Sequence, residues 1–310
     1  MRSATCIASL PSLLTGVLLV GSVLLLGCTA QSSPDRSAPA PVADSAYLTS
    51  EVWNDGKAEV AFYRVRRTTD QYGRDNPQSF TVGTYLVKHR FSPETMTKVT
   101  DGSGMSSFKY ALFYELESGS YQFKRNWVVN ARQHDLRPLK QSFTSFDWCS
   151  NRYEEMAFSS AGPIEVRMRS DDYGNERRTV EAHGYPPAQI PLLVRGLDLS
   201  GGAQTFTVVT MSGTTVEATA ELAGTEAIDT PTGTRQAERI TVTYGAPIPS
   251  LIGEKSDPKE VYWRGTGAER VLVKWQGHSG RYTATLAEQL RTPYWRENLW
   301  TKLERVSARP

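Results

Sequence analysis

Residues that commonly bind metals or carry thiol chemistry are scarce, with three cysteines and four histidines in 310 residues. Transition-metal sites bring histidines, cysteines and carboxylates together at close and regular spacing. The four histidines lie far apart along the chain, at His89, His134, His183 and His278. We therefore expect no metal site and no cofactor.

The motifs of several large enzyme classes are also missing. The chain has no Gly-x-Ser-x-Gly elbow, no P-loop and no Gly-x-Gly-x-x-Gly turn between a strand and a helix. Pairs of carboxylates could serve glycoside hydrolysis, but Glu154 with Glu155, and Glu115 with Glu117, are expected on solvated strand faces. We expect no catalytic residues and a protein that is not an enzyme. An enzyme ranks third, after a ligand-binding protein and a structural or assembly partner.

Neither sign of charge is in marked excess. The chain has 35 Lys and Arg and 33 Asp and Glu residues, which gives a formal net charge of +2. Nucleic-acid binding needs a concentrated basic face. The one short basic run, Arg64, Arg66 and Arg67, alternates with Val65 and reads as the solvated face of a strand. We expect no nucleic-acid partner.

Only one long apolar run occurs, from Leu13 to Leu26, and it is followed by Gly27 and Cys28. A basic start, such a run and a small residue before a cysteine are typical of a bacterial lipoprotein signal. The alternative is a single membrane span, which needs about 20 apolar residues and usually a basic flank. Ser, Pro and Ala follow the cysteine instead of a basic flank. We therefore expect that Cys28 carries acyl chains, palmitate among them, and that this anchor attaches the protein to a membrane.

The chain divides into three expected parts. Residues 1–27 form the signal peptide, 28–46 the acylated cysteine with a flexible tether, and 47–310 a β-rich envelope domain. The tether has few large apolar side chains and so cannot bury enough surface to fold. Thr29 is not the aspartate that commonly retains lipoproteins at the inner membrane, so we expect the outer membrane and keep the inner membrane as the alternative.

After the tether, apolar residues recur with a period of two. Phe108, Tyr110, Leu112, Tyr114 and Leu116 fall on one face, and similar short segments follow between Gly, Asp, Asn and Pro turns. The pattern predicts an all-β fold with few short helices, an antiparallel meander that forms a curved sheet, half-barrel or sandwich. Brief helices are expected at 46–52 and 189–197.

Four other stretches carry specific expectations. Residues 219–235 predict either a long hairpin loop or a seam between two halves of the domain. The acidic stretch 171–176 predicts a hairpin turn rather than a calcium loop. Residues 291–300 predict a covering segment or an edge cap rather than a free tail. Cys149, beside Phe146 and Trp148, is expected to be a buried, unpaired thiol.

Segments 106–116 and 119–130 predict one hairpin with aromatic rings repeating on a face. Sheet curvature would gather such rings around an apolar groove, which is the kind of cavity that ligands prefer. The candidate ligand-binding residues are Tyr110, Leu112, Tyr114, Tyr121, Phe123 and Trp127. The alternative is that these side chains form an ordinary core, because large aromatics are common there.

Three stretches carry a resemblance to known proteins: Trp53–Val60, Ser142–Cys149, and the strand tryptophans Trp263 and Trp275. With these the chain resembles uncharacterised bacterial envelope lipoproteins with a mature domain of many antiparallel strands. At the level of architecture it also looks like the open half-barrels of periplasmic lipoprotein carriers, which hold acyl chains on a concave face. The resemblance implies no reaction and no catalytic residue.

Two functions of different classes follow. The first is a non-enzymatic lipoprotein that binds a lipid or another apolar envelope ligand in a curved sheet. The second is a structural or assembly partner of other envelope proteins, in which every aromatic ring is core and no small ligand is bound.

Replacing Cys28 tests the anchor directly. Cys28→Ala should abolish metabolic labelling with radioactive palmitate and leave the uncleaved precursor on a gel. The reason is that Cys28 is the cysteine that stands directly after the apolar run and Gly27. Cys149→Ala serves as the matched control and should label normally. Normal labelling of the Cys28→Ala protein would contradict the lipoprotein assignment.

Overall fold

The computed structural model describes residues 40–69, 74–118, 121–147, 150–159, 162–249, 251–252, 257–277 and 280–308, which belong to one compact unit. The expected signal peptide, Cys28, most of the tether and Cys149 lie outside these residues, as do Trp148 and His278. Within the described part of the chain, no helix is both long and apolar enough to cross a membrane.

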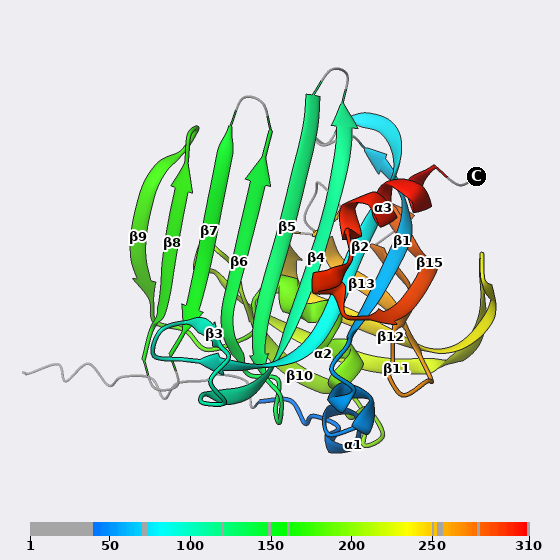
Figure 1. Ribbon diagram of the computed structural model, residues 1–310, viewed down its shortest axis with the longest axis horizontal. Helices are drawn as coiled ribbons and strands as arrows, with labels where there is room; N and C mark the ends of the chain where they lie inside the picture. Colours follow the sequence, from blue (N-terminus) through cyan, green and yellow to red (C-terminus); the bar gives the residue numbers. More distant parts are fainter. Residues whose placement is uncertain are drawn as a thin grey trace, which may run out of the picture. The chain divides into compact units, whose positions relative to one another are not determined.

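Antiparallel strands dominate the structure (Figure 1). They are β1 (Ala58–Thr69), β2 (Asp75–Ser92), β3 (Thr97–Val99), β4 (Met105–Ser118), β5 (Tyr121–Arg132), β6 (Pro138–Phe146), β7 (Asn151–Phe158), β8 (Ile164–Ser170), β9 (Gly174–Val180), β10 (Gln204–Val209), β11 (Thr215–Thr230), β12 (Gly233–Ile248), β13 (Asp257–Gly265), β14 (Leu272–Gly277) and β15 (Tyr282–Thr292). The predicted all-β class is confirmed.

The α-helices that the structure describes are short. They are α1 (Ser45–Leu48), α2 (Ile190–Gly196) and α3 (Leu299–Ser307), and single 3-10 turns precede or follow them at Glu51–Asn54, Pro187–Gln189 and Tyr294–Arg296. The two helices expected from the sequence are therefore present, with the first one divided. Pro191 lies in the first turn of α2, where a missing backbone N–H costs nothing.

The strands form one sheet in the order β10-β11-β12-β13-β14-β15-β1-β2-β4-β5-β6-β7-β8-β9, with β3 paired to β2. The first strand thus pairs with the last one, and the two edges of the sheet, β9 and β10, follow each other in sequence. The segment between these edges carries α2. Figure 1 shows the sheet curving so that α2 lies on its concave side.

The connection after β9 also lies along the other edge. The Tyr185 N–H donates to the carbonyl of Thr207 at 2.8 Å, and the Val209 N–H donates to the carbonyl of Tyr185 at 2.9 Å. Val209 packs with Met156 and Ile164 of β7 and β8. The sheet is therefore open, but its edge strand β10 is covered by the chain that follows β9, which protects backbone groups that would otherwise be unpaired.

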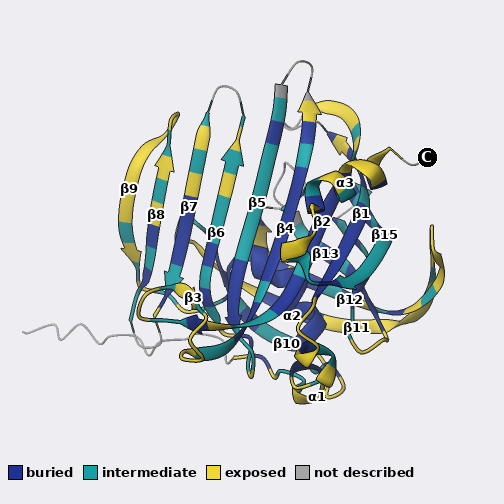
Figure 2. Ribbon diagram, in the orientation of Figure 1, coloured by how far each residue is buried: buried dark blue, intermediate teal, exposed yellow. Residues whose placement is uncertain are grey.

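The concave face holds the main hydrophobic core (Figure 2). The predicted alternation in β4 is confirmed, because its even-numbered apolar side chains, Phe108 to Leu116, all belong to this core. Every residue of α2 is buried as well. A helix buried on all sides needs its polar ends and its one charged side chain, Arg195, to find partners inside the protein.

A smaller core lies on the convex face beneath α3. Trp300 meets Phe113 edge to face with 5.2 Å between ring centroids, and Tyr294 stacks on Tyr85 at 4.3 Å. The predicted covering role of residues 291–300 is confirmed. These contacts seal a part of the sheet whose second face would otherwise expose large apolar side chains.

Arg195 of α2 is held by an ion pair with Glu59 of β1, in which both side chains are almost completely buried. Burial raises the pKa of Glu59, and the neighbouring Arg195 opposes this shift. Arg264 of β13 completes the end of the helix, since its Nη1 donates to the carbonyls of Val194 at 3.0 Å and Leu197 at 2.8 Å. Carbonyls at a helix C-terminus lack backbone partners, so an arginine satisfies them well.

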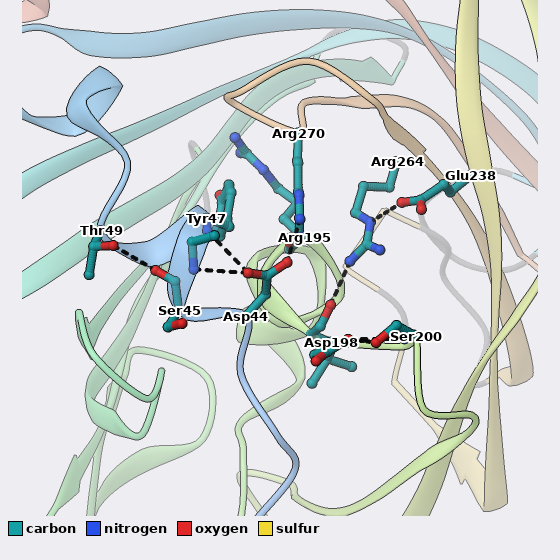
Figure 3. A network of polar contacts seen from close by, with 12 residues as sticks. Asp44, Ser45, Tyr47, Thr49, Arg195, Asp198, Ser200, Glu238, Arg264 and Arg270 are labelled. Carbon is teal, nitrogen blue, oxygen red and sulfur yellow. Dashed lines mark hydrogen bonds and ion pairs between the residues drawn. The ribbon is translucent and has the colours of Figure 1, made fainter.

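Two further ion pairs hold this region together (Figure 3). Arg264 is itself paired with Glu238 of β12 at 2.7 Å. Arg270 pairs with Asp44, the N-cap of α1, at 2.5 Å, and lies 5.2 Å from the ring centre of Tyr47. The N-terminal helix, α2 and the hairpin of β13 and β14 are therefore joined by charged groups rather than by apolar packing alone.

Three side chains that were expected on solvated strand faces, Arg67, Glu154 and Glu155, are buried instead. Arg67 is buried, because on β1 it shares the inner face with Val65 and reaches the carbonyl of Ile252 at 3.4 Å. Phe146 is exposed, at 47%. Glu154 and Glu155 are buried rather than solvated, since they pair with Arg152 and Lys140.

Residues 219–235, expected to be a loop or a seam, instead belong to the paired strands β11 and β12. Ala, Gly and Pro are depleted in strands, so this composition concealed a ladder that is set by backbone pairing. The acidic stretch 171–176 does form the predicted turn, between β8 and β9.

Removing the buried cation tests the importance of the Arg195 pair. Arg195→Met should lower the free energy of unfolding by about 3–5 kcal/mol, because it leaves the Glu59 carboxylate buried without its partner. Urea denaturation followed by circular dichroism measures the loss. Adding Glu59→Leu should recover much of it, since no charge then remains buried.

The matched control is Arg167→Met, which removes a half-exposed arginine paired with Glu165 on β8. A surface pair of this kind is worth about 0–1 kcal/mol. If Arg195→Met destabilised the protein no more than Arg167→Met, the buried pair would not be what fixes α2.

Candidate ligand-binding surface on the concave face

A row of aromatic rings crosses the concave face over four neighbouring strands. Phe80 of β2 lies 5.1 Å from Tyr114 of β4, Tyr114 stacks on Trp127 of β5 at 5.8 Å, and Trp127 lies 4.6 Å from Phe143 of β6, measured between ring centroids. We call these four residues the aromatic row. Strand pairing explains it, because Trp127 is the direct register partner of Phe143 and side chains of one parity share a face.

Arginines lie at both ends of the aromatic row. The guanidinium of Arg67 lies 5.2 Å from the ring centre of Phe80, and that of Arg152 lies 5.9 Å from Phe143 and 5.2 Å from Tyr173. These distances suit cation–π attraction. The row therefore combines an apolar surface with positive charge at its ends.

Burial along the aromatic row is uneven. Tyr114 is fully buried, and its hydroxyl donates to the carbonyl of Leu251 at 3.4 Å. Trp127 and Phe143 are only half-buried, and Tyr173 is 69% exposed. The part of the row on β5 and β6 is thus the part that a ligand could contact without displacing the core.

Arg152 is the polar residue best placed at this accessible end. It pairs with the buried Glu154 on its own strand, whereas its Nε–H is buried and has no hydrogen-bond acceptor among the described residues. A buried donor without a partner is costly. A water or a ligand oxygen between Arg152 and Phe143 would satisfy it.

A second polar cluster on the concave face is already satisfied. Tyr244 and Tyr262 each donate to the Glu260 carboxylate at 2.6 Å, and Tyr282 donates as well. Burial raises the pKa of Tyr244 and of Tyr262, and the nearby Glu260 charge raises both further. We assign this cluster to the support of the core, because all three phenol hydroxyls donate to the same buried carboxylate.

The predicted hairpin is confirmed, and the structure places five of the six predicted site residues on one of its faces. Tyr110, Leu112, Tyr114 and Phe123 are at most 8% exposed and belong to the main core. Trp127 is the half-buried member. The side chain of Tyr121 lies outside the described residues. Ligand binding by these six residues stays a prediction.

Sequence reasoning missed Phe80, Phe143, Arg67 and Arg152. Their positions depend on which strand pairs with which, and the alternation within a single strand does not contain this information. Phe143 carried a signal, since it stands between polar residues in Ser142-Phe143-Thr144. In the described part of the chain, no group of three or more His, Cys, Asp or Glu residues is placed to hold a metal ion.

Comparisons with known proteins add little. No family model matches the chain, and no curated protein matches it either. Among solved structures it is similar to a protein from Brucella abortus described as a beta-barrel-like protein of the domain of unknown function DUF1849. The identity is 8%, the TM-score is 0.47, and the match covers 76% of this chain and 98% of that one.

The difference in burial within the aromatic row predicts two different costs of truncation. Tyr114→Ala should lower the free energy of unfolding by about 3–5 kcal/mol, because it opens a cavity in the core. Phe143→Ala should cost less, roughly half as much, since part of that side chain is already in contact with solvent. Thermal or urea denaturation measures both, and equal costs would show that Phe143 is core.

Proposed function

We propose that the protein is a lipid-anchored envelope protein that binds an extended apolar ligand, an acyl chain above all, along the accessible part of the aromatic row. Binding occurs without catalysis. The anchor is the acylated Cys28, and the outer membrane is the proposed location. The observation that carries this function is the half-exposed pair Trp127 and Phe143, next to Arg152, on the concave side of a curved sheet.

The physical basis is the gain from covering aromatic surface. Burying apolar surface stabilises a complex by about 25 cal/mol for each Å² removed from water. Contiguous rings on a concave face let one chain contact several of them at once. Arg152 adds a donor that favours a ligand with an oxygen-bearing head group.

The position of α2 supports the same proposal. Its side chains fill one part of the concave face, where they are buried with the core of β1 and β4. The rings of Trp127 and Phe143 stay half-exposed beside this filled region. A ligand would therefore find a bounded strip of apolar surface rather than an empty barrel.

A fluorescent fatty acid titrated into the mature chain carrying Cys28→Ala tests the proposal. We expect saturable binding at micromolar concentrations and a loss of about tenfold in affinity in the Phe143→Ala variant, because one half-exposed ring is worth roughly 1–1.5 kcal/mol when a ligand covers it.

Phe146→Ala is the matched control. Phe146 belongs to the same strand as Phe143 but lies on the other face of the sheet, where Lys124 is its register partner. The Phe146→Ala variant should bind the probe like the unmodified protein. Equal affinity of the Phe143→Ala and Phe146→Ala variants, or no saturable binding at tens of micromolar, would favour the alternative of a structural or assembly partner without a small ligand.

A further inference from the structure

A cavity of about 690 Å³ lies apart from the aromatic row, where the turn before β3, the connection of β5 to β6 and the ends of β7 and β8 meet. We call it the rim cavity. Its volume is in the range of small-molecule sites in proteins. None of the residues of the aromatic row lines it.

The larger aliphatic, thioether and phenyl groups of the rim cavity come from five side chains. Leu139, Phe158 and Ile164 are buried, and Met96 and Met105 are half-buried, so the methionines present flexible thioether groups to the space. Methionine adapts its shape to apolar ligands of different curvature. This lining suits a hydrocarbon chain better than a rigid polar molecule.

The polar part of the rim cavity is mainly cationic. Arg132 and Arg137 line it together with His183, while Glu94 is the acidic residue among its described lining and accepts a hydrogen bond from Ser92 at 2.8 Å. Arg137 is 58% exposed at its side chain. The lining therefore favours an anionic head group at its entrance.

Both arginines are oriented by one carboxylate just outside the lining. The Asp135 carboxylate accepts a hydrogen bond from Arg132 Nε at 3.0 Å, and it lies 3.7 Å from Arg137 Nε. Two guanidinium groups share this single carboxylate, so their charge is only partly neutralised. A carboxylate or phosphate of a ligand could pair with Arg137 without breaking the closer Arg132 contact.

Backbone strain is concentrated around the same cavity. Met96 and Leu136 adopt positive φ angles of 54° and 57°, which residues other than glycine rarely do. Met96 is part of the lining, and Leu136 directly precedes Arg137. Strained residues of this kind often hold side chains at binding sites, and here they present a thioether and a guanidinium.

We propose that the rim cavity is a second ligand site, which takes one acyl chain with an anionic head group: the chain on Met96, Met105 and Phe158, and the head group on Arg137. Ala40, which belongs to the described end of the expected tether, also lines the cavity. The site itself requires neither the anchor nor the aromatic row.

Binding of oleic acid to the Cys28→Ala, Phe143→Ala chain, measured by calorimetry, tests the proposal without a contribution from the aromatic row. We expect one saturable site. Arg137→Glu should weaken oleic acid about tenfold, because it replaces attraction by repulsion, and should leave the uncharged oleyl alcohol nearly unchanged. Equal weakening of acid and alcohol, or of neither, would overturn the assigned head-group site.

The matched control is Arg177→Glu, which reverses the charge of another exposed arginine. Arg177 lies on β9, and its guanidinium is 3.4 Å from the carboxylate of Glu165 on β8. The Arg177→Glu variant should change the affinity for oleic acid less than twofold. A loss as large as that of Arg137→Glu would show a general effect of net charge and contradict a local site.

Ala182 is half-buried and lines the cavity, so the larger side chain in Ala182→Trp should fill the space and abolish binding of both ligands. Thr179 is exposed on β9 and does not line the cavity, so Thr179→Trp should leave binding unchanged. Circular dichroism checks that each variant is folded, and Arg137→Glu keeps the proposal testable if Ala182→Trp is not. A parallel titration with lysophosphatidylglycerol distinguishes a phosphate from a carboxylate head group by the tighter affinity.

The results separate the two proposed sites. Loss of binding in Phe143→Ala alone concerns the aromatic row, and loss in Arg137→Glu or Ala182→Trp concerns the rim cavity. If the chain lacking Phe143 bound neither amphiphile, or if Ala182→Trp bound both as before, the rim cavity would not be a ligand site.

Discussion

The ion pair between Arg195 and Glu59 is the contact on which the architecture depends most. It places two ionisable side chains, both almost completely buried, inside an apolar core, where an unpaired charge would be very costly. The pair ties α2 to β1, the strand that joins the two halves of the sheet order. Because α2 belongs to the connection between the edge strands β9 and β10, the pair also holds this connection against the middle of the sheet.

This arrangement decides which part of the concave face is core and which part is surface. Near Arg195 of α2, the rings of Tyr63 and Tyr110 are buried, and Tyr114, whose hydroxyl bonds to the carbonyl of Leu251, is buried as well. Toward β5 and β6 the same face keeps Trp127 and Phe143 half-exposed. The concave face therefore has both properties that the sequence left as alternatives, an ordinary aromatic core and an accessible apolar surface, in neighbouring regions.

Local patterns predicted much of the fold but little of the site. The hairpin of β4 and β5 followed from alternation, and α2 followed from its proline and apolar run. Glu59 and Arg195 are 136 positions apart, and no pattern links them. Phe80 and Phe143 join the aromatic row only because of strand order and register. Arg67 looked like a solvated residue because a charged side chain on an inner face cannot be recognised without its partners.

We propose that Trp127 and Phe143 form an open surface for an apolar ligand on the concave face. The most direct measurement is photo-crosslinking of the folded protein with a fatty acid that carries a diazirine near its methyl end, followed by peptide mass spectrometry. The account predicts labelled peptides from β5 and β6 that contain these residues, and labelling that an excess of oleic acid suppresses. Labelling that leaves these peptides untouched, or that oleic acid does not suppress, would contradict it.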